Sequence, residues 1–175
     1  MIKIETERLI LREYQKTDWE AVHSYGQQAD ILIYEAWGPN SEADTKAFIE
    51  KVIIDSKKQP RMAFELCITL KSNGKLIGGC GFRIHKENLN KGDFGYIIHP
   101  DYWNKGFATE AAKALLYFMV KNKDIKKIEA TCDRLNIASQ RVLKKCGLQN
   151  VGVVKQDFEM KGRLRDTYFF EKNMQ

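Results

Sequence analysis

The stretch that decides the fold spans residues 99–110 and reads HPDYWNKGFATE. An expected strand ends here and an expected helix begins, because Pro100 stops strand pairing and an amphipathic pattern starts after Gly106. The unpaired N–H groups of a first helical turn and the positive end of the helix dipole then face the same space. This predicts a phosphate site, in which Gly106 lets the backbone approach the ligand, Ala108 leaves it unblocked and Lys105 adds charge. The spacing alone also allows an ordinary glycine turn before a helix.

The strands before this stretch are predicted by a change of period. Residues 62–70 alternate between two sets of side chains, as in a half-buried strand. The turn pair Asn73-Gly74 then returns the chain into a second strand over residues 76–84. A third strand is expected over residues 93–99. The helix after Gly106 carries apolar side chains on one face, so we expect it to pack on these strands.

The two ends of the chain supply further elements. Residues 9–13 look like a first strand, and Thr17 followed by Glu20 offers a capping box for a first helix. A second helix is expected to start after Ser41 and to end near residue 57 or 58.

After the central helix, a strand is expected over residues 127–132 and a short helix over residues 137–146, closed by Gly147. Two final strands fit residues 151–159 and 164–171. This order predicts an α/β protein with a mixed sheet, mainly antiparallel in its middle, in a single domain over residues 1–175.

Composition excludes several classes. With 43% hydrophobic and 30% charged residues, the chain is able to form a core, so disorder is ruled out. The longest apolar runs, residues 115–120 and 52–54, are far shorter than the ~20 residues of a membrane span. The first residues lack a signal-peptide pattern, so a cytoplasmic protein is expected. Four scattered cysteines and three histidines give a zinc site no support, and no metal is expected.

The charge balance favours anionic ligands. The chain has 29 basic and 23 acidic residues, which gives a net charge of +6. Nucleic acid, an acidic protein surface and a polyphosphate cofactor all fit this charge. A basic nucleic-acid-binding module is disfavoured, because the lysine cluster at residues 121–127 lacks interleaved aromatic residues and any recognition motif.

A second segment, residues 136–148, carries polar side chains around the short helix. Asn136 comes just before it, Ser139 lies one turn in, and Lys144 and Lys145 lie at its end. Taken alone, Asn136 is interpreted as an N-cap, and the two lysines as solvent-exposed charges that are favourable at the negative, C-terminal end of the helix dipole.

Together, the two segments resemble the GNAT superfamily of acetyl-CoA-dependent N-acyltransferases, and within it the RimJ/RimL-like branch of ribosomal-protein N-terminal acetyltransferases. The resemblance runs nearly end to end. It begins with residues 6–12, passes through Gly95-Tyr96 and residues 102–112, and ends with residues 136–147 and the late Gly162. It implies the fold of that superfamily, a central sheet that splays apart and is flanked by helices.

The resemblance also implies how acetyl-CoA binds and leaves as CoA. The strand ending at His99 splays from its neighbour, and the pantetheine arm bonds to the backbone of Ile97, Ile98 and His99. Asn136 reaches the pantetheine. The pyrophosphate sits on Lys105, Gly106, Phe107, Ala108 and Thr109. Asn104 and Lys145 are also expected to bind the cofactor.

Three positions bear on catalysis within the resemblance. Trp103 stands where the wider superfamily begins its phosphate loop with Gln or Arg, as is usual in this branch. The tyrosine that many relatives use as general acid would fall at Leu143, which has no proton to give. Ser139 occupies the place of a serine that the branch is proposed to use for that role.

The acetyl transfer that the resemblance implies needs a neutral amine to attack the thioester, groups that stabilise the oxyanion, and a proton for the departing thiolate. Asp93, on the strand lining the expected cleft, is the first candidate to take the amine proton, although it reads equally well as a solvated turn carboxylate. His99 is an alternative base. The N–H of Ile97 or Ile98 is expected to stabilise the oxyanion.

The acceptor is less defined. The loop over residues 28–40, with Tyr34 and Trp37, is placed to shape a substrate entrance. We expect a primary amine, either a protein N-terminus or a small molecule, with no membrane partner and a monomer or homodimer. A catalytically silent acyl-CoA-binding regulator is the alternative to an enzyme.

Overall fold

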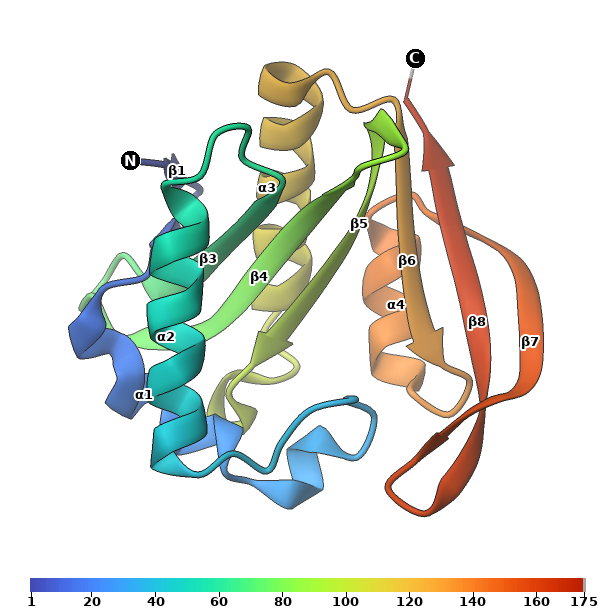
Figure 1. The fold of residues 1–175 in the computed structure, drawn as a ribbon, viewed down its shortest axis with the longest axis horizontal. Helices are drawn as coiled ribbons and strands as arrows, with labels where there is room; N and C mark the ends of the chain where they lie inside the picture. The colour runs from blue at the N-terminus through green and yellow to red at the C-terminus, as the bar shows by residue number, and fades with distance from the viewer. Residues whose placement is uncertain (175) are drawn as a thin grey trace.

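A mixed eight-stranded sheet forms the centre of the molecule, which the computed structural model describes for residues 1–174, without the side chains of Asp157, Phe158 and Met160 (Figure 1). The strand order is β1-β2-β3-β4-β5-β6-β8-β7, and every neighbouring pair is antiparallel except β5 and β6. The α/β prediction is therefore confirmed. The strands are β1 Lys3–Glu5, β2 Leu9–Glu13, β3 Ala63–Leu70, β4 Leu76–His85, β5 Asn88–Ile98, β6 Lys127–Asp133, β7 Gln149–Met160 and β8 Arg163–Asn173.

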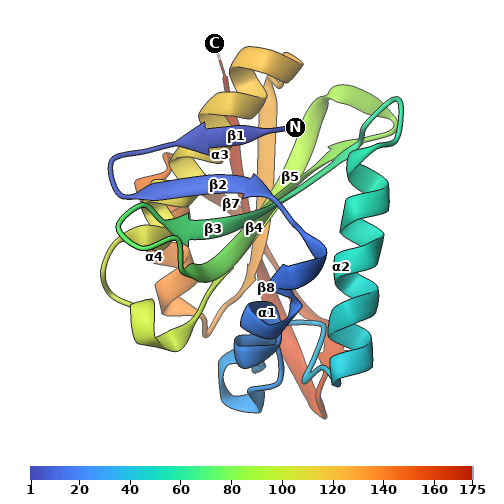
Figure 2. The same cartoon turned by 90° about the vertical axis from the view of Figure 1, so that its left-hand side faces the viewer.

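Helices cover both faces of the sheet (Figure 2). The α-helices are α1 Trp19–Gly26, α2 Glu42–Ser56, α3 Phe107–Lys123 and α4 Ile137–Lys145, and the short 3-10 helices are η1 Lys16–Asp18, η2 Ala29–Leu32 and η3 Pro100–Tyr102. Within residues 1–174, no helix combines the length and apolar character that crossing a membrane requires.

The core lies in two layers, one on each face of the sheet. Between the sheet and α3, the fully buried side chains include Leu66, Phe82 and Leu115. Under α1 and α2, a second cluster includes Tyr25, Ile49 and Cys67. The expected half-buried strand over residues 62–70 is therefore corrected: Cys67 and Thr69 are buried on the face opposite Leu66, because α1 and α2 cover that side.

Helix starts show which capping predictions hold. Ser41 caps α2 as expected: its Oγ accepts a hydrogen bond from the Asp44 N–H at 3.2 Å, and the Asp44 carboxylate accepts from the Ser41 N–H. The capping box expected from Thr17 and Glu20 is wrong. The box instead pairs Gln15 with Asp18 at η1. Asp18 also accepts hydrogen bonds from Arg12 at 2.7 and 2.8 Å, and the capped turn therefore begins two residues earlier than expected.

The parallel pair β5 and β6 meets over only a short length. Its register joins Lys91, Gly92 and Asp93 to Lys127, Ile128 and Glu129. Past Asp93 the two strands diverge, as Figure 1 shows. The splayed sheet expected from the resemblance is therefore present, and the gap opens toward the end of β5 that precedes η3.

Candidate active site

A cavity of about 470 Å³ opens where β5 and β6 diverge. Its walls come from the end of β5, the loop before α3, the start of α4 and the loop around η2. The residues that line it and that could bind a ligand or take part in a reaction are Asp30, Tyr34, Glu35, Tyr96, Ile97, Ile98, Trp103, Asn104, Gly106, Phe107, Ala108, Thr109, Asn136, Ser139, Arg141 and Lys145. Two segments singled out from the sequence, residues 99–110 and 136–148, therefore meet at one site.

The loop before α3 turns sharply to present the helix start to this cavity. Asn104 and Gly106 both have positive φ, 60° and 81°, and Gly106 is the residue from which α3 begins. A side chain on Gly106 would be strained at this φ. The loop thus aims the first N–H groups and the positive dipole end of a 17-residue helix at the cavity.

The N-terminal stretch braces this loop. The Glu110 carboxylate accepts hydrogen bonds from the Thr6 hydroxyl at 2.6 Å and from the Arg8 N–H at 2.9 Å. The Arg8 Nη1 donates to the carbonyl oxygen of Lys105 at 3.0 Å, and its guanidinium lies over the Phe107 ring. The sequence pattern predicted no role for Thr6 and Arg8 in holding this loop.

The end of β5 is tied to the same loop. The indole Nε1 of Trp103 donates to the carbonyl oxygen of Ile98 at 2.6 Å, and the His99 N–H donates to the Ile77 carbonyl on the β4 side at 2.8 Å. Because backbone groups alternate along an antiparallel strand, the Ile98 N–H points away from β4, into the gap. Of the two expected oxyanion donors, Ile98 rather than Ile97 has the suitable direction.

Helix α4 brings polar groups to the opposite wall. Asn136 is an N-cap, since its Oδ1 accepts from the Ser139 N–H at 3.0 Å. The Tyr96 hydroxyl donates to the Ser139 Oγ at 3.3 Å. Burial raises the pKa of Tyr96, and its bond to Ser139 only partly opposes this, so Tyr96 stays a neutral donor. Arg141 and Lys145 place positive charge on the same wall; Tyr96 and Arg141 were not predicted.

The η2 loop supplies an acidic end. Asp30, Tyr34 and Glu35 line the cavity, so the loop over residues 28–40 borders it, whereas Trp37 is not in the lining. Burial raises the pKa of Glu35, an effect partly offset by a hydrogen bond with the Trp37 side chain and by the charges of Lys161 and Arg165. Trp37 itself is 39% exposed, so it is not part of the core.

Three expected site residues lie outside the lining of this cavity. The Lys105 ammonium donates to the Asp101 carbonyl at 2.7 Å, and the backbone N–H of His99 is used by Ile77. Asp93 lies five residues before Ile98, about 16 Å along an extended strand. Its Oδ1 is 2.9 Å from the Nε2 of His85. The roles expected for these three residues stay predictions, and their positions do not favour them.

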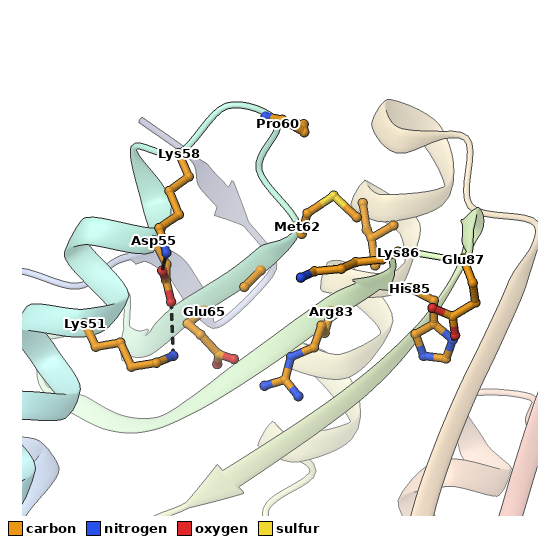
Figure 3. Close-up of a pocket in the computed structure, with 12 residues that line it drawn as sticks. Lys51, Asp55, Lys58, Pro60, Met62, Glu65, Arg83, His85, Lys86 and Glu87 are labelled. Carbon is orange, nitrogen blue, oxygen red and sulfur yellow. Dashed lines mark hydrogen bonds and ion pairs between the residues drawn. The ribbon is translucent and has the colours of Figure 1, made fainter.

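A larger cavity, of about 590 Å³, lies elsewhere, between α2, β3 and β4. Figure 3 shows side chains of both charges around it, among them Lys51, Asp55, Glu65 and Arg83. The end of α2 that borders it is the C-terminal one, whose dipole repels anions. A polyphosphate therefore fits the smaller cavity at the splayed strands better.

Comparison with known proteins agrees with this geometry. The chain is 33% identical over 168 residues to the uncharacterized N-acetyltransferase YnaD of Bacillus subtilis, with 95% of this chain and 94% of that protein covered. A GNAT-family acetyltransferase structure from Bacillus anthracis is 30% identical and superposes with a TM-score of 0.87 over 98% of both chains.

A ribosomal L7/L12 N-acetyltransferase, RimL, solved with coenzyme A, shares the fold with a TM-score of 0.88 at 19% identity, over 99% of this chain and 98% of that one. Residues 8–149 match the family model described as an acetyltransferase (GNAT) domain. That match takes in the splayed strand, the glycine loop before α3 and the Asn136 cap of α4, and the chain therefore belongs to the GNAT acetyltransferase family.

Proposed function

We propose that the protein transfers the acetyl group of acetyl-CoA to a primary amine by direct attack of the amine on the thioester. The observation that carries this proposal is the meeting of two features in one cavity: the N-terminus of α3, and the unpaired edge of β5 past Asp93. The first suits a pyrophosphate, and the second offers backbone groups to an amide-containing arm. Two structural neighbours, RimL and the self-immunity acetyltransferase MccE, were solved with CoA and acetyl-CoA respectively.

In this proposal the cofactor lies along the seam between β5 and the two helices. The pyrophosphate binds the backbone of residues 104–109 at the start of α3. The pantetheine runs along the edge of Ile97 and Ile98 toward Asn136. Because the Asn136 Oδ1 is occupied by the Ser139 N–H, its amide NH₂ is the group left to face the ligand. Arg141 and Lys145 add positive charge near the phosphates.

The same geometry assigns roles in the reaction. The amine nitrogen attacks the thioester carbon, and the Ile98 N–H donates to the oxyanion that forms. The C–S bond then breaks, and the Ser139 hydroxyl gives its proton to the departing thiolate. Tyr96 holds the Ser139 Oγ by a hydrogen bond, and its hydroxyl proton is in position to replace the one that Ser139 gives up.

The acceptor is a cationic amine in this proposal. The cofactor wall carries Arg141 and Lys145, whereas the η2 loop carries Asp30 and Glu35. The basic end of the cavity attracts the polyphosphate of the cofactor, and the acidic end attracts the cationic amine. A protein N-terminus and a small primary amine both satisfy this chemistry.

The decisive experiment is a screen of amines and peptides for acetyl-CoA-dependent release of CoA thiol. We expect release with at least one amine, and an increase in melting temperature when acetyl-CoA or CoA is added, because a ligand that binds only the native state stabilises it. Stabilisation without thiol release from any acceptor would point to a silent acyl-CoA-binding regulator. Absence of any stabilisation would contradict the cofactor site.

A further inference from the structure

The tip of the β7–β8 hairpin touches the η2 loop, although the two segments are far apart in the chain. The Lys161 ammonium donates to the carbonyl oxygen of Leu32 at 2.6 Å, across 129 residues of sequence, and to that of Trp37 at 3.2 Å. In Figures 1 and 2 the hairpin tip lies beside this loop. These two carbonyls flank Glu35 in the sequence.

Lys161 and Glu35 meet at a single backbone atom. The Glu35 N–H donates to the same Leu32 oxygen, at 3.0 Å, that accepts from Lys161. The ammonium is thereby a second donor to the carbonyl that closes the turn on which Glu35 lies. Residues 33–41 connect η2 to α2, and Lys161 ties this connection to the hairpin on both sides of Glu35, which lines the cavity.

Glu35 borders the cavity that holds the proposed reacting groups. It lines the cavity together with Tyr96 and Ser139. Its charge lies close enough to Tyr96 to raise the pKa of that phenol further, in addition to the larger effect of burial. The charged groups around Glu35 are Lys161 and Arg165 from the hairpin, Asp30 from η2, and Arg141 and Lys145 from α4 on the cavity wall.

We infer that Glu35 is the catalytic residue that binds the acceptor amine and takes its proton, and that Lys161 is a positioning residue that holds Glu35 in place. The inference rests on the proposed acetyltransferase function and supplies the base that Asp93, far along β5, does not provide. The ammonium of the acceptor first gives a proton to Glu35, which passes it to solvent, and the neutral nitrogen then attacks the acetyl carbon. As the N–C bond forms, the nitrogen loses a second proton to Glu35. The C–S bond breaks, the thiolate takes the proton of Ser139, and the proton on Glu35 returns to Ser139 through solvent.

The environment of Glu35 suits a base for an amine. Burial raises the pKa of Glu35, and a carboxylate with a raised pKa binds a proton more strongly than an ordinary one. The hydrogen bond with Trp37 and then the positive charges of Lys161 and Arg165 partly oppose this effect of burial. Removal of the Lys161 charge should therefore raise the pKa of Glu35 further.

The test compares Glu35→Gln with the exposed control Glu20→Gln in kcat/KM for an amine across pH 6 to 10, with acetyl-CoA binding measured separately by thermal shift. Glu35→Gln should keep the acetyl-CoA shift and lose about 10²- to 10⁴-fold in kcat/KM near neutral pH. Part of that loss should return at high pH, where more of the amine is already neutral. Glu20→Gln should match the wild type. An unchanged pH profile in Glu35→Gln overturns the inference and leaves the acetyltransferase function standing, because the wild type still releases CoA.

The positioning role is tested with Lys161→Met, its conservative partner Lys161→Arg and the exposed hairpin control Lys155→Met. Lys161→Met should raise KM for the amine about tenfold and move the acidic limb of the kcat/KM profile to higher pH, while the acetyl-CoA shift stays. Lys161→Arg should restore most of both values. If Lys161→Met fails to fold, Lys161→Gln is measured instead, with the same expected results. An amine KM and an acidic limb equal to those of Lys155→Met overturn the role of Lys161.

Discussion

The guanidinium of Arg8 places two nitrogens, Nε at 2.7 Å and Nη2 at 2.6 Å, on a single carboxylate oxygen of Glu110. The other oxygen of that carboxylate accepts from Thr6 and from the Arg8 backbone. Glu110 lies in the first turn of α3, directly above the loop of Gly106. The β1–β2 connection therefore holds the helix end at which the phosphates are proposed to bind.

Arg8→Ala should weaken CoA binding. The substitution removes the support of the Lys105 carbonyl and of Glu110, so the loop must be ordered by the ligand at the moment of binding. We expect roughly a tenfold rise in the dissociation constant for CoA by calorimetry, with Arg8→Lys intermediate because it keeps the charge but not the planar fork. An Arg8→Ala protein with wild-type affinity would show that the brace is dispensable.

Glu110→Gln should alter the dependence of stability on pH. Burial alone would raise the pKa of Glu110, but hydrogen bonds from Thr6 and Arg8 outweigh it, and the pKa lies below the ordinary 4.5. The stability that this ion supplies is present above pH 4.5 and is lost as pH falls through the lowered native pKa. Urea unfolding should find wild type more stable than Glu110→Gln at pH 7, by a difference that shrinks toward pH 3. A constant difference would contradict this.

Gly106→Val should abolish the increase in melting temperature on adding CoA. Valine is strained at φ 81°, and its branched side chain would stand at the mouth of the phosphate loop, where a Cβ lies 3.4 Å from the Arg8 Nη2. The matched control is Gly74→Val in the β3–β4 turn, at φ 71° with nothing within 4 Å. Both variants bear a similar backbone cost of ~1–2 kcal/mol. Only Gly106→Val should lose the CoA effect; equal shifts in both would remove the loop from the site.

The variants Ser139→Ala and Tyr96→Phe distinguish the role of the proton donor, Ser139, from that of Tyr96, which hydrogen-bonds to it. Ser139→Ala should lower kcat by about 10²-fold with little change in CoA affinity, because a group that assists the leaving thiolate acts in the transition state. Tyr96→Phe should lower kcat less, since it leaves the serine hydroxyl in place. Steady-state kinetics with a fixed amine measures both. A kcat for Ser139→Ala equal to wild type at every pH would exclude Ser139 as donor.

Asp93→Asn should leave catalysis nearly unchanged, which contrasts with the large loss expected if Asp93 were the base. Its carboxylate is 47% exposed and pairs with His85, outside the cavity. We expect kcat/KM within about threefold of wild type, below the 10² that marks a lost general base. A loss of 10² or more, partly recovered at high pH, would return Asp93 to the mechanism.

The elements with strong periodicity were predictable from the sequence. The apolar faces of β3 and α3, the Asn73-Gly74 turn and the Ser41 cap depend on neighbours in the chain, and the structure has each of them. β1, Lys3–Glu5, was missed because so short a strand exists only through its pairing with β2. The burial of Cys67 was missed for a related reason, since it depends on how α1 and α2 lie over the sheet.

The residues of the candidate site also fall into those that local sequence predicts and those that depend on contacts between distant parts of the chain. The backbone features at Gly106 and Asn136 follow from local sequence and were predicted. Arg8 and Glu110, 102 residues apart, carry no local pattern that pairs them. Glu35 sits in an irregular loop, and its environment is made by Lys161 from the other end of the chain. Asp93 was placed on the right strand, but position along that strand depends on where the pairing with β6 ends.

The brevity of the β5–β6 contact has a mechanical consequence. Within the sheet, three residue pairs at one end join a five-stranded part, β1 to β5, to a three-stranded part, β6 to β8. A ligand that lies in the gap contacts both parts of the sheet where β5 and β6 no longer pair, and so joins the two parts at a second place. When the ligand binds, amide hydrogen exchange should slow at Ile98 in β5 and at residues 136–139 beside β6. Little change is expected around Lys91 and Lys127, where β5 and β6 are already paired.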